Sequence, residues 1–276
     1  MRRISVGTVL IFAGLLAFIV AAVGADLFAS NDPLRQSLLL RLRPPGTMTA
    51  TAYFPLGTDD LGRDLLARIL YGARASLLVA ALSVSVSLLV GVTLGLIAGW
   101  FGGWVSIVAM RAVDTMLSIP AILLAVLTVA VLGPGFINLV LVLGLTRWPR
   151  YTRVAYAQTL QVAALPYVRA AEMAGCGPGR ILLRHVLPNI AGPLMVVATS
   201  EFGLMILFEA SLSFLGLGIQ PPYPSWGSIM SAGRQYVVRA WWLTAFPGAC
   251  LFGVVLCVNL FGDWLRDRVD PRSQGR

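Results

Sequence analysis

Apolar segments long enough to cross a lipid bilayer recur along this chain. A bilayer core about 30 Å thick needs about 20 predominantly apolar residues in each helical span. Only 12% of the 276 residues are charged, whereas a soluble domain carries about 25%. We therefore expect an all-α integral membrane protein with about six transmembrane helices. Five of the predicted spans lie at about 6–29, 76–99, 119–132 (with Pro120 inside), 190–214 and 242–265. The fourth span begins near residue 136 and runs into the arginines that begin at 147.

The polar segments between these spans predict how the chain is organised. Residues 1–75 are expected to hold an N-terminal span, an extracytoplasmic loop and an interfacial helix. Residues 76–265 would form the transmembrane domain, and residues 266–276 a cytoplasmic tail. The first span could also be a signal peptide, but its long apolar run without a clear cleavage site favours an uncleaved helix.

The interfacial helix is predicted from the end of the first loop. There Leu65, Ile69 and Ala73 share one helical face while charged residues occupy other positions, a pattern that suits a membrane surface. Residues 110–114 precede the third span, and Arg111 and Asp114, three residues apart, could pair on one helix face. The start of the interfacial helix could be capped by Thr58, Asp59 or Asp60.

All 21 basic side chains are arginine, and their distribution predicts the orientation in the membrane. With the N-terminus inside, the predicted cytoplasmic segments hold 13 arginines and the outside segments hold 8. This bias follows the positive-inside rule, so both termini are expected in the cytoplasm. The absence of lysine excludes a Walker-type P-loop, whose lysine reaches the nucleotide phosphates. The scattered arginines form no basic face, so nucleic acid is not an expected partner.

Metal binding and catalysis by this chain are not expected. The three cysteines, Cys176, Cys250 and Cys257, have no CxxC or Cys/His spacing. His185 is the only histidine and has no ligand pattern or Ser-His-Asp arrangement around it.

Three glycines in the second span repeat every fourth residue. Gly91, Gly95 and Gly99 therefore lie along one stripe of a helix. Small residues at this spacing let another helix approach closely in a membrane. We predict tight helix packing along this stripe.

Glu201 and Glu209 lie within the fifth span, where a carboxylate is costly. Such groups usually face a bundle interior, a partner or a water-filled cavity. Both glutamates could line a polar path through the membrane or pair with a partner subunit, and Glu209 could instead cap or brace the SLSFLGLG segment that follows it.

The segment YVRAAEMAGCGPGRILLRHVLPN, residues 167–189, resembles the EAA loop of binding-protein-dependent ABC importer permeases. In that family the loop forms a short helix, a turn and a second helix that docks on the ATPase. The resemblance implies an ATPase-coupling loop at 165–189 here. The positions that match the family pattern are Ala170, Ala171, Gly175, Leu187 and Pro188.

One position departs from the family pattern. Arg169 stands where the family has glutamate, and Glu172 follows one turn later. We hypothesise that Glu172 makes the acidic contact or that the ATPase carries a compensating acidic residue. The resemblance also gives His185 a coupling or structural role.

The resemblance extends over nearly the whole chain. Segments 54–78, 110–125, 131–135, 209–227 and 259–272 are similar to the C-type permease of dipeptide, oligopeptide and nickel importers. This similarity implies a type I ABC importer permease fold with cytoplasmic coupling helices, in a bacterial or archaeal cytoplasmic membrane. It also implies a homologous second permease, two cytoplasmic ATPases that use ATP and Mg, an extracytoplasmic substrate-binding protein and surrounding lipid as partners. No cofactor is expected on this chain itself.

Peptides are the expected cargo because they are the commonest cargo of the family, and nickel or another small solute is the alternative. An ion-coupled secondary transporter is a different class, but no convincing internal repeat or pair of broken helices supports it. A membrane-embedded enzyme would need convergent catalytic groups, which the spans lack.

Overall fold

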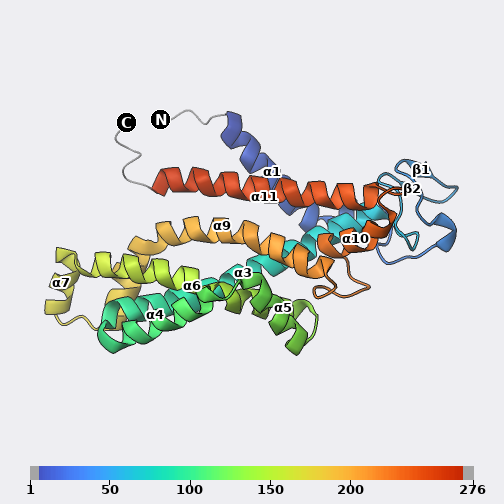
Figure 1. The fold of residues 1–276 in the computed structure, drawn as a ribbon. Coiled ribbons are helices and arrows are strands. Elements are labelled where there is room, and N and C mark those ends of the chain that lie inside the picture. Colours follow the sequence, from blue (N-terminus) through green and yellow to red (C-terminus); the bar gives the residue numbers. More distant parts are fainter. Residues whose placement is uncertain (1–5, 270–276) are drawn as a thin grey trace.

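The computed structural model describes residues 6–269, and these residues are mostly helical. Figure 1 shows long helices running side by side between a small hairpin at one end and α7 at the other. In chain order the elements are α1 (Val6–Val23), α2 (Ala25–Phe28), η1 (Leu38–Leu40), β1 (Thr47–Met48), β2 (Tyr53–Phe54), α3 (Leu65–Phe101), α4 (Gly103–Ser118), α5 (Ala121–Leu132), α6 (Phe136–Ala163), α7 (Pro166–Met173), α8 (Pro178–Ile181), η2 (Leu182–Val186), α9 (Leu187–Phe214), α10 (Trp226–Gly233), η3 (Arg234–Tyr236) and α11 (Trp242–Val269).

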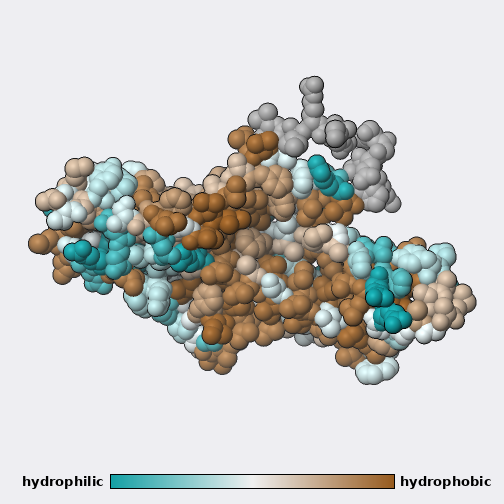
Figure 2. All heavy atoms as spheres, turned by 180° about the vertical axis from the view of Figure 1, so that it is seen from behind, coloured by the Kyte–Doolittle hydropathy of each residue, from teal (hydrophilic) through white to brown (hydrophobic). Residues whose placement is uncertain are grey.

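The membrane character of the chain is visible on its surface. In Figure 2 hydrophobic residues cover the middle of the molecule, while hydrophilic residues gather toward both ends. Three described helices are long and apolar enough to cross a membrane, and the bent pair α4–α5 could supply a fourth span. Two predicted spans fall outside this set. The apolar part of α1 is short, and α6 carries arginines in its second half.

The core is built around α3 and α6. These two helices share the most extensive contact in the described part of the chain, while α9 packs on α11 and α3. Fully buried Val79 and Ala80 of α3 meet Leu139 and Leu143 of α6 in this core. Ser87 of α3 donates a 2.7 Å hydrogen bond to the Gly144 carbonyl. This bond crosses between the helices at a depth where backbone and side-chain polar groups need partners.

The predicted interfacial helix is wrong as a separate element. Residues 65–73 are the first turns of the 37-residue helix α3, and Leu65, Ile69 and Ala73 are buried in the protein core. The cap is Asp64, whose carboxylate accepts from the backbone N–H groups of Leu66 and Ala67. The amphipathic face therefore packs on protein rather than on the membrane surface.

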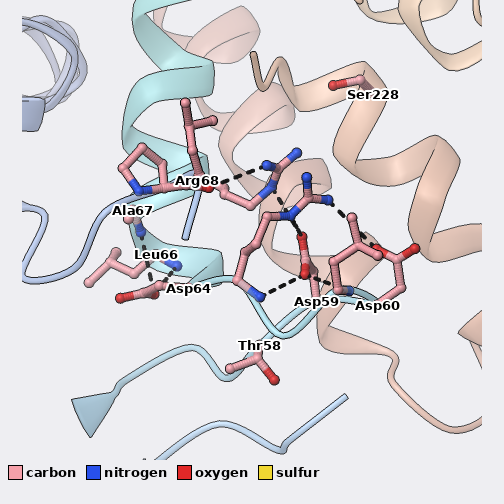
Figure 3. A network of polar contacts seen from close by, with 12 residues as sticks. Thr58, Asp59, Asp60, Asp64, Leu66, Ala67, Arg68 and Ser228 are labelled. Atoms are coloured by element: carbon pink, nitrogen blue, oxygen red, sulfur yellow. Dashed lines mark hydrogen bonds and ion pairs between the residues drawn. The ribbon is translucent and has the colours of Figure 1, made fainter. Parts of the chain in front are cut away.

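A buried polar network fixes the start of α3 (Figure 3). The Asp59 carboxylate lies 2.7 Å from Arg63 Nε and 3.2 Å from Arg68 Nε. Trp242 Nε1 donates to the Thr58 carbonyl at 3.2 Å, which links the same loop to α11. None of the three predicted cap candidates, Thr58, Asp59 and Asp60, caps α3, and Asp59 is instead the centre of two ion pairs.

The same network affects the neighbouring carboxyl group, Asp60. Burial raises the pKa of Asp60 above its ordinary value, and the adjacent Asp59 charge raises it further. Arg63 approaches Asp60 only at 3.8 Å. Asp60 is therefore the less well compensated of the two acids.

The third predicted span is broken. Helices α4 and α5 meet at an 89° bend at Ile119–Pro120, where the proline ends regular hydrogen bonding. Asp114 pairs with Arg153 of α6 at 2.7 Å, so the predicted local pair with Arg111 does not form. The long-range pair joins α4 to α6.

The fourth and sixth predicted spans are longer than the sequence suggested. The helix α6 continues through Pro149 and all three arginines to Ala163. The helix α11 continues to Val269, so the first four residues of the predicted tail are helical. Residues 1–5 and 270–276, which include Arg2, Arg3, Arg272 and Arg276, lie outside the described part of the chain.

Candidate coupling surface and translocation residues

The loop at 165–189 forms the short helix α7, a reversal and the first turns of a second, longer helix. Pro166 occupies the first turn of α7, where its missing N–H costs nothing. The helix ends ahead of Gly175, whose φ of +81° is a conformation that glycine adopts without strain. The chain then enters α8 and passes through the π-helical turn η2 into α9. Residues 178–214 therefore form one continuous 37-residue helix.

The two helices of this loop are held against the protein by a small apolar cluster. Val168 of α7 is buried together with Ile181 and Val186 of the second helix. Asn189 Nδ2 donates to the Tyr167 hydroxyl at 2.9 Å and to the His185 carbonyl at 2.6 Å. These contacts fix α7 relative to α9, so the two helices can move together.

His185 has a structural place in this loop. Its ring packs edge-on against Tyr167, with centroids 6.1 Å apart. Among residues 6–269, no group of three or more histidine, cysteine, aspartate and glutamate side chains could hold a metal ion.

The outer surface of the loop carries the residues that the family resemblance singled out. Arg169, Ala170 and Glu172 are exposed, and Ala171 is half-buried. Arg169 and Glu172 line a hollow of about 690 Å³ with Trp100 of α3. Neither charge forms an ion pair with another described residue. At the end of the loop, Leu187 is half-buried and Pro188 is exposed.

The glycine stripe of α3 lies against α6. A Cβ atom on Gly95 would lie 2.5 Å from Ala155 Cβ. A Cβ on Gly91 would lie 2.5 Å from the Trp148 carbonyl oxygen, and one on Gly99 would lie 2.7 Å from Thr159 Cβ. All three distances are shorter than real side chains tolerate, so the helices approach this closely only with glycine.

Glu201 is fully buried and paired with two arginines of α6. Arg147 binds it through two bonds, Nε to Oε2 at 2.8 Å and Nη2 to Oε1 at 2.9 Å. Arg150 Nη1 adds a third bond at 3.0 Å. The bidentate pair offsets the cost of placing a carboxylate inside a membrane protein.

Glu209 lies two turns further along α9 and is also fully buried. Its Oε1 accepts a 2.7 Å hydrogen bond from the Ser213 hydroxyl. The Ser213 oxygen in turn accepts from the Ile219 N–H at 3.3 Å. This arrangement places Glu209 among contacts that brace the turn after α9, which favours the bracing alternative over the path.

The sequence interpretation missed the side of α6 that faces Glu201. Arg147, Arg150 and Arg153 were treated as a cytoplasmic exit signal, but they are three residues apart and so fall on one side of a helix. Arg150, Arg153 and Glu201 line a pocket of about 420 Å³ between α4, α6 and α9. An intramembrane glutamate needs a counter-charge, and that requirement was the available signal.

Comparison with known proteins identifies the family of this chain. A sequence profile described as the inner membrane component of binding-protein-dependent transport systems matches residues 91–275. The chain belongs to this family. As a component of a binding-protein-dependent system, this permease is a multi-pass protein of the inner membrane, as the sequence resemblance predicted.

Relatives of the permease align over nearly its whole length. The di/tripeptide transport permease DppC of Pseudomonas aeruginosa is 44% identical over 94% of this chain and 86% of its own length. The dipeptide transport permease DppC of Escherichia coli K12 is 44% identical over 95% of this chain and 87% of its own. The putative peptide transport permease of Brucella suis is 41% identical over 98% of this chain and 88% of its own.

Two solved structures share the fold. The inward-facing MetNI methionine ABC transporter aligns with a TM-score of 0.55 at 18% identity, over 73% of this chain and 96% of that chain. An amino acid ABC transporter crystallised with histidines aligns with a TM-score of 0.54 at 16% identity, over 73% and 94%. The helical arrangement of this permease is therefore that of ABC importer membrane subunits.

Proposed function

We propose that this permease forms half of the translocation path of an ATP-driven importer of di- and tripeptides or longer peptides. The observation that carries the cargo assignment is the 44% identity over nearly the full length to two permeases named for di/tripeptide and dipeptide transport. The other half of the path would come from a homologous second permease. Two cytoplasmic ATPases would bind ATP and Mg, and an extracytoplasmic binding protein would deliver the peptide.

The proposed topology has six crossings and the type I importer arrangement. The crossings are α1, α3, the bent pair α4–α5, α6, α9 and α11, with both termini in the cytoplasm. In Figure 1 the helix α11 ends toward the same end of the molecule as α7, which supports placing the C-terminus on the coupling side. The length of α6 supports its crossing in spite of its arginines, because two of them form ion pairs with Glu201.

The proposed mechanism links the ATPases to the path through α7. The exposed surface of α7, with Ala170, Ala171 and Glu172, would dock on an ATPase. When ATP closes the ATPase pair, α7 would move and carry the continuous helix of residues 178–214 with it. ATP must favour one conformation over the other for this coupling to work. Glu201, in the middle of that helix, would then move relative to the arginines of α6.

The test is reconstitution of the complete system. The tagged permease is purified in mild detergent with its partners and placed in proteoliposomes with ATP inside and the loaded binding protein outside. We expect ATP-dependent uptake of a radiolabelled dipeptide such as Ala-Ala. Uptake driven by an ion gradient without ATP, or a permease that purifies alone under gentle extraction, would contradict the proposal.

The charge reversal at Arg169 is tested in the same system. Arg169→Glu restores the family's charge, and Glu172→Gln removes the only acidic group of α7. If Glu172 contacts the ATPase, Glu172→Gln should uncouple ATP hydrolysis from uptake and Arg169→Glu should compensate in the double variant. Unchanged coupling in both single variants would show that these charges do not contact the ATPase.

A further inference from the structure

If α6 crosses the membrane from Phe136 as proposed, Arg150 lies where an exposed guanidinium cannot face lipid. It is 14 residues after Phe136, the first residue of α6, which corresponds to about 21 Å along the helix. If α6 crosses as proposed, this position falls within the apolar core, which is about 30 Å thick. The Arg150 side chain is nevertheless 55% exposed in the single chain. A charged group there must face water or protein.

The surroundings of Arg150 provide a pocket whose lining is partly charged and partly apolar. The polar residues that line the pocket of about 420 Å³ between α4, α6 and α9 are Arg150, Arg153, Ser200 and Glu201. The rest of its lining comes from one leucine and two valines. A small peptide has the same combination of charged ends and apolar side chains.

The charge of the cluster is unbalanced. Arg147 and Arg150 carry two positive charges against the single negative charge of Glu201. Arg153 is paired with Asp114, so this second pair adds no net charge. The pocket therefore carries one net positive charge.

The excess charge resides on Arg150. Arg147 holds Glu201 through two bonds and is 10% exposed, whereas Arg150 gives Glu201 only Nη1. A guanidinium has five N–H donors in a planar fork, which suits a second carboxylate. The buried ion pair with Arg147 thus positions Glu201. Glu201 in turn holds Arg150 through Nη1 and leaves the other N–H donors of the Arg150 guanidinium for a ligand.

We propose that Arg150 is a specificity-determining residue that binds the carboxylate of the peptide as it passes the inner half of the path. This proposal rests on the proposed function, because it takes a peptide as the cargo. Binding at this point favours substrates with a free carboxylate. It also keeps the peptide from exposing an unpaired charge inside the membrane.

The first test measures the charge of the pocket without transport. Ser200 is exposed at the pocket, so Ser200→Cys is introduced into the purified complex after Cys176, Cys250 and Cys257 are replaced by alanine. The measured quantity is the ratio of the reaction rate with an anionic methanethiosulfonate reagent to the rate with a cationic one. We expect this ratio to be about fivefold higher or more for Ser200→Cys than for free cysteine. Adding Arg150→Gln should abolish this preference, and Arg150→Lys should keep it. Equal preferences with and without Arg150→Gln would overturn the proposal.

The second test asks whether peptide carboxylate is the ligand. Millimolar Ala-Ala should slow labelling of the Ser200→Cys complex severalfold, and Ala-Ala amide should protect less. In proteoliposomes Arg150→Gln should reduce the maximal uptake rate of Ala-Ala about tenfold or more, while Arg150→Lys retains most of it. The matched control is Arg111→Gln, an exposed arginine of α4 that does not line the pocket, and it should leave uptake unchanged.

The outcomes separate the two proposals. If the unaltered complex takes up no peptide, the proposed function fails. If it takes up peptide but Arg150→Gln and Arg150→Lys behave alike, or if the amide protects as well as the free peptide, only the role of Arg150 fails. An equal loss of uptake in Arg150→Gln and Arg150→Lys would point to a structural role of Arg150 instead.

Discussion

Replacement of Gly95 by alanine should force α3 and α6 apart. The new Cβ would lie 2.5 Å from Ala155 Cβ and 2.7 Å from the Thr152 carbonyl oxygen. The second atom belongs to a helix backbone and cannot turn aside as a long side chain could. Overpacking of this kind costs about 1–3 kcal/mol. Alanine also stabilises a helix interior by roughly 0.5–1 kcal/mol relative to glycine, which offsets part of that cost.

A matched control separates packing from helix propensity. Gly248 of α11 is also a helical glycine, but a Cβ there would meet only Met230 Cε at 3.8 Å, an ordinary contact. Gly248→Ala therefore has the same change of residue without the overpacking. The free energies of unfolding of the two variants should differ by about 1–3 kcal/mol, with Gly95→Ala the less stable.

The assay is reversible unfolding of the purified permease in mild detergent, titrated with SDS and followed by far-ultraviolet circular dichroism. Gly99→Ala should be milder than Gly95→Ala, because its closest contact is the Thr159 side chain and the nearest backbone oxygen is 3.1 Å away. Equal stability of Gly95→Ala and Gly248→Ala would refute the claim that α3 and α6 touch at this stripe.

Three further predictions concern the end of the molecule that carries the β1–β2 hairpin, and they use the same unfolding assay. Asp59→Ala should destabilise the permease by about 3–5 kcal/mol, because it leaves two buried arginines without their carboxylate. Asp26→Ala breaks an exposed ion pair and should cost far less, and equal costs for the two variants would contradict the role of burial. The pKa of Asp60 in the folded protein is raised above its ordinary value of 3.8. The stability of the wild type relative to Asp60→Asn should therefore be highest below about pH 4 and should fall as the pH rises through the folded pKa. A stability difference that does not depend on pH would count against this prediction. Trp226→Phe removes the 3.1 Å hydrogen bond from Nε1 to the Ile69 carbonyl and should cost about 1 kcal/mol or more, and a variant as stable as the wild type would show that the bond contributes nothing.

The sequence predicted those features that depend on local periodicity. The apolar segments correspond to helices, and Gly91, Gly95 and Gly99, four residues apart, lie on the side of α3 that faces α6. The family resemblance is confirmed by the profile match and by near full-length relatives. These signals need only neighbouring residues or matched motifs.

The sequence could not predict the contacts that join distant segments. Glu201 and Arg147 are 54 positions apart, and Arg153 and Asp114 are 39 apart. Hydropathy scores each of these charges as an interruption of a span, although paired charges are tolerated there. The interfacial helix failed for a related reason, since periodicity finds an apolar face but cannot say whether protein or lipid covers it.

The continuity of residues 178–214 has a mechanical consequence. A straight helix of 37 residues is about 55 Å long. If this helix tilts by about 5° around its outer end (Phe214), its inner end moves by about 5 Å. Glu201 is 13 residues from Phe214 and moves by less than about 2 Å. The displacement at Glu201 is therefore smaller than the displacement at the inner end of the helix. A broad movement under α7 would reach the Glu201–Arg147 pair as a displacement just large enough to break hydrogen bonds of 2.8–2.9 Å.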